Sequence, residues 1–303
     1  MNRTAGVEHR TNKKRSSTRE APLAILRKWT RNSALRNIAG ESCTLSFLVC
    51  RIRGFEQLAV SYEADPDGLC RFVRRGATLM ADAVHAHGGT IDRVFAGGFS
   101  AYFNATPETD SHAPKACACA LAMVLAAEEV NAKSAGSDPL RIGIGLNTGS
   151  AIIGDFGTED EPYYAAVGSA AERADALERL SSLYGTIILA GPAMEKEAGR
   201  SFPFLQVDLQ TDNAGEPSPV WTLLAPPFSR SHPKFLALKS FHARLFDALR
   251  ARDWQQARAV VAQCHALSGA NPVLCDFYLQ RIAHFEAHPP EDAWNGVLMP
   301  AAS

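Results

Sequence analysis

The nine residues "CRIRGFEQL", residues 50–58, combine residue types and a spacing that suit the binding of an anion. The apolar run "TLSFLV" before them predicts a strand, a glycine follows as a tight turn, and the next residues have a helical pattern. A helix that starts in this way points unpaired backbone N–H groups outward, which suits a phosphate. The guanidinium group at the end of the strand adds a positive charge. The candidate phosphate-binding residues are Arg51, Ile52, Arg53, Gly54 and Phe55.

The composition describes a protein with a substantial core and no strong overall charge. The chain has 303 residues, of which 46% are hydrophobic, and its formal net charge is -1. This balance gives no general attraction to nucleic acid, so we expect no specific nucleic-acid partner. No apolar run approaches the ~18 residues of a membrane span, and the N-terminus lacks the apolar core of a secretory signal. We therefore expect a cytoplasmic protein without a transmembrane span.

The residues that most often bind metals lack the spacing of a metal site. The 7 cysteines sit mostly in apolar segments and form no CxxC pair, which favours reduced thiols in the core. Cys117 and Cys119 are two residues apart on a predicted helix, so they point in different directions. We predict no metal site from the other candidates, which we expect to be solvated: His85, His87, His112, Asp155 and the acidic residues 158–161.

Three regions of the chain differ in composition. Residues 1–40 predict a basic, partly disordered segment with a short amphipathic helix at residues 21–36. That helix could lie on a membrane surface, or pack against this chain or a second copy. Residues 41–225 alternate strand and helix patterns, and residues 226–303 begin with a Pro-rich linker and continue with helices.

Residues 41–225 predict an α+β domain. A strand at residues 44–52 precedes a helix closed by Gly88, and a hairpin follows around Gly97 and Gly98. A second helix at residues 112–133 precedes two strands around the "NTG" of residues 147–149. The order, with later additions, is the ferredoxin-like βαββαβ plan, in which one antiparallel sheet carries its helices on one face. The other face is then open for a partner.

Residues 234–288 predict three helices. Asp253 can cap the second helix, Gly269 can end it, and Pro272 can open the third. This arrangement resembles one tetratricopeptide-type unit followed by a capping helix. Because a single repeat cannot bury its apolar face alone, we expect the extension to dock on the main domain or on another chain.

Three motifs in the central region carry a family likeness. They are "RIRGF", "HGGTIDRVFAGG" and "LRIGIGLNTGSAIIGDFGTEDEPYYAAVG", and their order and spacing resemble the catalytic domain of class III adenylate and guanylate cyclases over roughly residues 43–223. The tail with "PPEDAWNGV" is similar to the segment that follows this domain in many bacterial cyclases. The resemblance implies the cyclase fold and a head-to-tail homodimer, or a heterodimer with another cyclase-type domain, with active sites at the interface.

The resemblance also implies a chemistry that this chain is poorly equipped to perform. In the family, two aspartates hold two divalent ions, Mg²⁺ or Mn²⁺, so that a ribose 3′-oxygen attacks the α-phosphate of ATP or GTP. Arg51 stands where the first aspartate is expected, and Gly97 stands where the second is expected. With ~4 kcal/mol for each pair of unit charges at ~4 Å, the arginine would oppose metal binding by on the order of 10 kcal/mol. We therefore expect no metal cofactor.

The remaining family roles also fall on unsuited residues. The purine-selecting lysine corresponds to Arg93, and its polar partner corresponds to Ala165. The ribose-orienting asparagine corresponds to Glu172, and the arginine that neutralises transition-state charge corresponds to Ala176. A lysine that would meet the terminal phosphates falls near Asp212. The degenerate catalytic positions are thus Arg51, Gly97, Arg93, Ala165, Glu172 and Ala176.

Two interpretations of Arg51 stay open. Its guanidinium group could replace the metal charge and hold ATP or GTP without turnover, or it could pair with a nearby acid such as Asp92 or Glu172. For the whole protein, the favoured hypothesis is a catalytically inactive cyclase-homology domain that dimerises and regulates or scaffolds a partner in intracellular signalling. The alternatives are an active adenylate or guanylate cyclase, which would need Mg²⁺ or Mn²⁺, and a nucleotide sensor without turnover.

Overall fold

The computed structural model describes most of the chain outside its first residues. The described ranges are residues 40–103, 111–133, 138–158, 160–212, 215–226, 229–267, 270–292 and 294–297, and they belong to one compact unit, Ile38–Ser303. The expectations for the basic segment and its amphipathic helix lie outside the described residues. Within those ranges, no helix combines the length and the apolar character that a membrane span requires.

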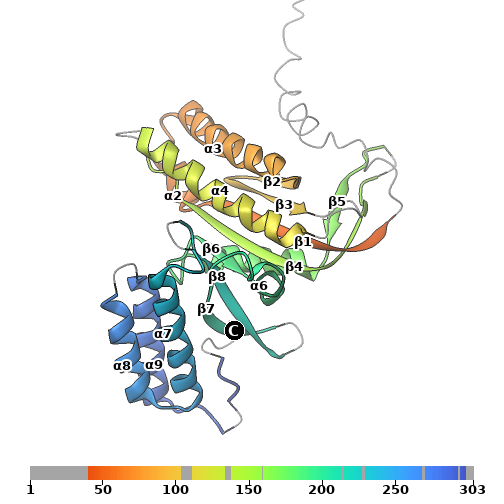
Figure 1. Ribbon diagram of the computed structural model, residues 1–303. Helices are drawn as coiled ribbons and strands as arrows, with labels where there is room; N and C mark the ends of the chain where they lie inside the picture. Colours follow the sequence, from red (N-terminus) through yellow and green to blue (C-terminus); the bar gives the residue numbers. More distant parts are fainter. Residues whose placement is uncertain are drawn as a thin grey trace, which may run out of the picture. The chain divides into compact units, whose positions relative to one another are not determined.

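An eight-stranded mixed sheet organises this unit (Figure 1). The strand order is β2-β3-β1-β4-β6-β8-β7, and β5 pairs with β4 at one end. β4 runs antiparallel to β1 and parallel to β6. The strands are β1 (Glu41–Ile52), β2 (Thr90–Phe95), β3 (Gly98–Phe103), β4 (Ile142–Asp155), β5 (Tyr164–Val167), β6 (Ile188–Ala190), β7 (Phe204–Thr211) and β8 (Pro217–Leu223).

Eight helices accompany the sheet among the described residues. They are α2 (Phe55–Ser61), α3 (Pro66–Ala86), α4 (His112–Lys133), α5 (Ser169–Leu180), α6 (Pro192–Ala198), α7 (Pro233–Arg250), α8 (Trp254–His265) and α9 (Pro272–Ala287). The predicted α+β class is confirmed, as are the hairpin at Gly97 and the helix at residues 112–133. Three of these elements, β5, β7 and α6, were not predicted from the sequence.

The prediction of two strands around "NTG" is wrong. β4 is one continuous strand, and β1 pairs with it along its length, from Glu41 opposite Ile153 to Ile52 opposite Ile142. Asn147 lies opposite Phe47 in the middle of this ladder. A turn there would break backbone hydrogen bonds that the long partner strand supplies, so the pairing overrides the local turn propensity of the three residues.

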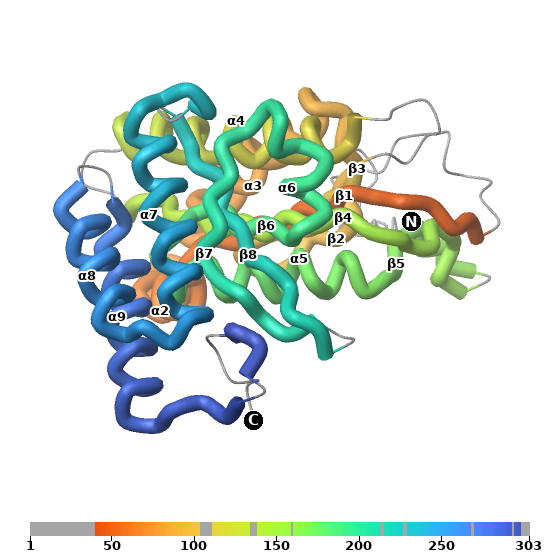
Figure 2. Tube along the Cα trace, turned by 60° about the horizontal axis from the view of Figure 1, so that its bottom comes forward, coloured from red at the N-terminus to blue at the C-terminus, as the bar shows by residue number. Residues whose placement is uncertain are grey.

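Helices cover both faces of the sheet, whereas the ferredoxin-like plan predicted one covered face. On one face, the Ser46 and Thr148 hydroxyls lie 2.6 Å apart, and Ser46 bonds the His112 ring of α4. On the other face, Gly145 of β4 meets α5: a Cβ added there would lie 1.9 Å from the Ala174 carbonyl oxygen. Side chains alternate along a strand, so residues 145 and 148 point to opposite faces. Figure 2 shows α4 and α5 on opposite sides of the strands.

The C-terminal helices dock on the sheet of their own chain. The Tyr278 hydroxyl donates to the Val207 carbonyl of β7 at 2.7 Å, and the Asn271 amide donates to the Tyr184 carbonyl at 2.7 Å. The predicted helix cap at Asp253 and the predicted helix start at Pro272 are confirmed, while Gly269 lies outside the described residues. Of the two docking sites expected for the extension, the structure thus shows the main domain.

Asp208 is a fully buried carboxyl group beneath these helices. It accepts hydrogen bonds from the Tyr184 hydroxyl and, at 2.7 Å, from the Leu209 backbone N–H. Burial raises the pKa of Asp208 to about 6, because the charged form loses its hydration, although both hydrogen bonds act in the opposite direction. The folded protein therefore binds a proton here at a pH where the unfolded chain has already released it.

We expect this group to make the folded protein less stable as pH rises. Its contribution is fully present below the unfolded pKa of about 4 and is lost as pH rises through about 6, a change of about 3 kcal/mol at most. Urea unfolding between pH 4 and pH 7, compared with Asp208→Asn, measures it. The variant should lack this part of the pH dependence; identical profiles for the two proteins would contradict the assignment.

Candidate functional site

Arg51 lies at the end of β1, between two glycines of the neighbouring strands. Gly98 of β3 is its partner on one side and Gly143 of β4 on the other. Because neither partner has a side chain, the Arg51 side chain has room to extend across the sheet toward α5. Its guanidinium carbon also stacks over the Phe95 ring, 4.7 Å from the centroid.

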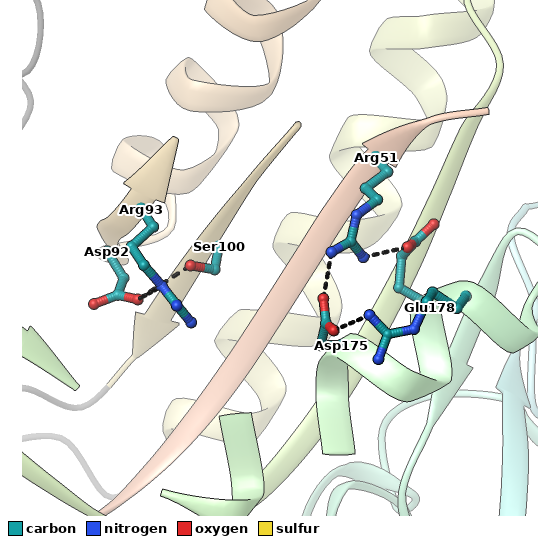
Figure 3. Close-up of polar contacts among 7 residues, drawn as sticks. Arg51, Asp92, Arg93, Ser100, Asp175 and Glu178 are labelled. Carbon is teal, nitrogen blue, oxygen red and sulfur yellow. Dashed lines mark hydrogen bonds and ion pairs between the residues drawn. The ribbon is translucent and has the colours of Figure 1, made fainter. Parts of the chain in front are cut away.

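Two carboxylates of α5 form ion pairs with the Arg51 guanidinium group (Figure 3). Nη1 donates to Glu178 at 2.5 Å, and Nη2 donates to Asp175, which is also paired with Arg179. The two acids are one helical turn apart and therefore face the same way. The expectation that Arg51 pairs with a nearby acid is confirmed, but the acids are Asp175 and Glu178 of α5 and not the suggested Asp92 or Glu172.

Glycines on β4 bring α5 close enough for this ion pair. A Cβ on Gly143 would lie 2.6 Å from a Glu178 carboxylate oxygen, and one on Gly145 would lie 2.5 Å from the Glu178 backbone nitrogen. Both distances are too short for a real side chain. The helix therefore rests directly on the strand, and any larger residue at these two positions would push the carboxylates away from Arg51.

The charges in this cluster are partly withdrawn from water. The Glu178 side chain is 6% exposed, and burial raises the pKa of its carboxyl group even though Arg51 pulls that pKa down. Burial also disfavours the charged form of Arg51, but the hydrogen bonds and charges of Asp175 and Glu178 outweigh it, so the pKa of Arg51 is raised. Each partner thus compensates the desolvation of the other.

Arg53 adds a second half-buried cation beside the pair. Its Nη2 donates to the Ser181 hydroxyl at 2.8 Å and to the Thr186 carbonyl, while its buried Nε has no hydrogen-bond partner within the described residues. Burial lowers the pKa of Arg53, since the nearby Glu178 only partly offsets the loss of hydration. The guanidinium group is directed into the protein and serves to anchor the end of α5.

The turn after β1 has few free donors for an anion. The N–H groups of Ile52 and Arg53 donate to the backbone carbonyls of Gly97 and Arg141, at 2.7 and 2.8 Å. The backbone N–H groups available to a phosphate at this turn are those of residues 52–55. Two of these four therefore already donate within the protein. The helix that begins at Phe55, α2, has only 7 residues.

Gly97 occupies the hairpin turn in a conformation that suits glycine. Its φ angle is +75°, and an added Cβ would lie 2.6 Å from Cγ of Phe55. An aspartate in this turn would be strained by its backbone and would collide with an aromatic ring. The second metal carboxylate is therefore missing from the sequence, and the turn as folded has no place for it.

Arg93 and Ala165 lie on β2 and β5, where Asp92 joins the two strands. The buried Asp92 accepts from the Ser100 hydroxyl at 3.1 Å and from the Ala166 backbone N–H at 3.1 Å, and Arg93 Nε lies 3.2 Å from it (Figure 3). Arg93 is 60% exposed at its side chain. Asp92 is thus a structural acid of this half of the domain.

The other predicted positions lie on α5 and after β7. Glu172 is exposed in the first turn of α5, and Ala176 follows Asp175 on the same helix. Asp212 closes the turn between β7 and β8, where its side chain accepts from the Glu216 N–H at 2.9 Å. The structure therefore brings Arg51 and Gly97 together at one strand end, gathers Arg93 and Ala165 around Asp92, and leaves Asp212 in a structural turn.

Comparison with known proteins identifies the family of this domain. Residues 39–194, more than half of the chain, match the family model of the adenylate and guanylate cyclase catalytic domain. The chain belongs to this family. It is 30% identical over 142 residues to adenylate cyclase 1 of Rhizobium meliloti, which covers 46% of this chain and 21% of that protein. It is 26% identical over 157 residues to an adenylate cyclase of Anabaena cylindrica, which covers 50% of this chain and 30% of that protein.

The fold agrees with this membership. The crystal structure of the guanylyl cyclase Cya2 superimposes with a TM-score of 0.54 at 27% identity, covering 63% of this chain and 98% of that one. The match to this chain therefore spans less than a third of the length of the two curated relatives, but nearly the full length of the solved Cya2 chain.

The family's two divalent ions do not fit the residues of this domain. A guanidinium group paired with two carboxylates stands where the cyclase resemblance implies the first metal ligand, and a glycine with positive φ stands where it implies the second. Among the described residues, no group of three or more His, Cys, Asp or Glu side chains is arranged to hold a metal ion. No catalytic step through bound metal follows from this arrangement.

The acidic partners of Arg51 were not among the predicted site residues. Two arginines, Arg51 and Arg53, stand at the end of a mostly apolar run and in the turn after it, and cations at the edge of a core require counter-charges. The helix pattern "AERADALERL" offers two acids one turn apart, Asp175 and Glu178. These two signals together could have identified the cluster.

Removing the Arg51 guanidinium group should destabilise the fold. Arg51→Ala leaves Glu178 buried without its main counter-charge, and we expect a loss of about 2–3 kcal/mol in the free energy of unfolding. Arg179→Ala, which removes a cation that is 62% exposed, should cost less than about 1 kcal/mol. Urea unfolding measures both variants. An Arg51→Ala protein no less stable than Arg179→Ala would refute a structural role for the pair.

Proposed function

We propose that this chain is a catalytically inactive cyclase-homology domain that dimerises and regulates or scaffolds a partner in signalling. The observation that carries the proposal is the ion pair of Arg51 with Asp175 and Glu178 at the first metal-ligand position. A positive charge held there by two carboxylates repels a divalent ion, and the carboxylates are engaged by the arginine. Without the ions, the ribose hydroxyl is not activated and the charge on the phosphates is not neutralised.

The sensor alternative has less support than the scaffold. To hold a phosphate, Arg51 would have to break its ion pairs with Asp175 and Glu178. The buried Glu178 carboxylate would then have lost its main counter-charge. The backbone N–H groups of Ile52 and Arg53 are bonded elsewhere. Nucleotide binding at the turn therefore competes with contacts that stabilise the fold.

An apolar surface on the β4–β5 pair supports association with another cyclase-type domain. Ile152 and Val167 are direct cross-strand partners, and each is 51% exposed. Phe156 and Tyr163 continue the same two lines of residues beyond the last strand pair and are also exposed. Alternation places these four side chains on one face of the pair. We propose that the partner is a second copy of this chain, as the family resemblance implies. The alternative is a heterodimer with another cyclase-type domain.

The protein should form no cyclic nucleotide. Purified full-length protein incubated with ATP or GTP and either Mg²⁺ or Mn²⁺ should give product at the level of the enzyme-free control, in an assay calibrated with an active family member. Cyclic product that persists in Arg51→Ala but is lost in Asp92→Asn, with both variants folded, would establish an active cyclase with a rearranged site and overturn the proposal.

Charges on the β4–β5 surface should weaken self-association. We expect Ile152→Glu combined with Val167→Glu to raise the dimer dissociation constant about tenfold or more, because two apolar side chains would become charged in the interface. Leu236→Glu, at a 53% exposed apolar residue of α7, is the matched control and should have no effect. Sedimentation velocity distinguishes them. A dimer unaffected by the double change would place the interface elsewhere.

A further inference from the structure

Two cysteines and a histidine meet inside the C-terminal helical region. Cys264 comes from α8, Cys275 from α9 and His242 from α7, and all three line one enclosed cavity of about 50 Å³ above β7 and β8. Cys264 is 7% exposed and Cys275 is 3% exposed. The cavity has room for a molecule of two or three heavy atoms. This site is on a different part of the sheet from Arg51.

The surroundings of His242 fix its proton on one nitrogen. Nδ1 lies 2.9 Å from the Gln206 carbonyl oxygen, which can only accept, so Nδ1 carries the hydrogen. The Tyr278 hydroxyl, which is 3.4 Å from the same nitrogen, donates its own proton to Val207. In the neutral ring the lone pair is then on Nε2, the nitrogen that can accept the proton of the Cys264 thiol.

The two thiols differ in acidity because of these contacts. A hydrogen bond from Cys275, together with one to His242, lowers the pKa of the Cys264 thiol despite its burial, while the same contact raises the pKa of Cys275. Burial alone raises the pKa of Cys117 and Cys119, and burial together with the nearby Glu178 raises the pKa of Cys50, so these are ordinary core thiols. Cys264 differs from these thiols in geometry too, because a second thiol and an imidazole line the same cavity.

We propose that Cys264 and Cys275 form a peroxide-reactive dithiol that closes to a disulfide between α8 and α9. The Cys264 thiolate attacks one oxygen of hydrogen peroxide, the O–O bond breaks, and hydroxide leaves as the sulfur becomes a sulfenic acid. The Cys275 sulfur then attacks that sulfur and displaces its oxygen, which leaves as water. In total, two thiols and one peroxide give one disulfide and two waters.

His242 and Cys275 have different tasks in this sequence. His242 accepts the proton of the Cys264 thiol and is a positioning residue for the thiolate, while Cys275 resolves the sulfenic acid. The disulfide joins two helices that pack on β7 and β8, so oxidation adds a covalent link within the helical region that covers this end of the sheet. The groups facing the thiols from other elements, Thr186, Thr222 and Asn271, are neutral and do not oppose a negative sulfur.

The test is peroxide treatment of the full-length protein followed by alkylation and tryptic mass spectrometry. Residues 259–281 form one tryptic peptide that contains both cysteines, so the disulfide appears as the loss of two hydrogens and of both alkylation sites. We expect this change at peroxide concentrations that leave the exposed Cys70 unmodified, and its reversal by dithiothreitol. Oxidation of Cys70 while both thiols of the peptide remain alkylatable would overturn the proposal.

Single variants separate the roles of the two thiols. Cys275→Ser should stop at a Cys264 sulfenic acid that dimedone traps, and Cys264→Ser should leave Cys275 unoxidised. Cys119→Ser, a core thiol on α4, is the control and should form the disulfide as the unmodified protein does. If dimedone labels neither variant, or if the disulfide forms only after unfolding in urea, the folded pair is not reactive and the proposal fails.

Discussion

The pairing of Arg51 with Asp175 and Glu178 is the interaction on which the chemistry of this domain depends. It places a cation, already neutralised by two carboxylates, at the end of β1, where the cyclase resemblance implies a metal ligand. The pair is partly buried, so each charge depends on the others for compensation. The cluster is therefore a stable part of the fold, and a metal would have to displace an arginine whose removal leaves a carboxylate unpaired.

The scaffold around this pair is that of an intact cyclase domain. Close approach of α5 to β4 at Gly143 and Gly145 sets the position of the two acids, and the turn at Gly97 keeps its conformation without a carboxylate. This close approach of the helix to the sheet brings the counter-charges to Arg51. The packing of the cyclase fold is thus retained with residues other than those that the cyclase resemblance implies for phosphates and metals, and a fold alone does not determine function.

Sequence patterns were sufficient for the elements with strong periodicity or clear boundaries. α4, the hairpin at Gly97, the cap at Asp253 and the helix start at Pro272 follow from local rules that the structure confirms. The path of β4 through "NTG" could not be derived locally, because β1 determines it from about 100 residues away. The loss of carboxylates at positions 51 and 97 was visible in the sequence, but the partners of Arg51 depend on how closely α5 approaches the sheet.

Electron paramagnetic resonance of Mn²⁺, titrated into the protein with ATP or GTP present, tests the central claim most directly. If Arg51, Asp175 and Glu178 neutralise one another at the metal position, the spectrum should remain that of the manganese–nucleotide complex in solution. A signal from protein-bound Mn²⁺ that titrates to two ions per site, and that is lost when carboxylates near the end of β1 are replaced by amides, would contradict the account.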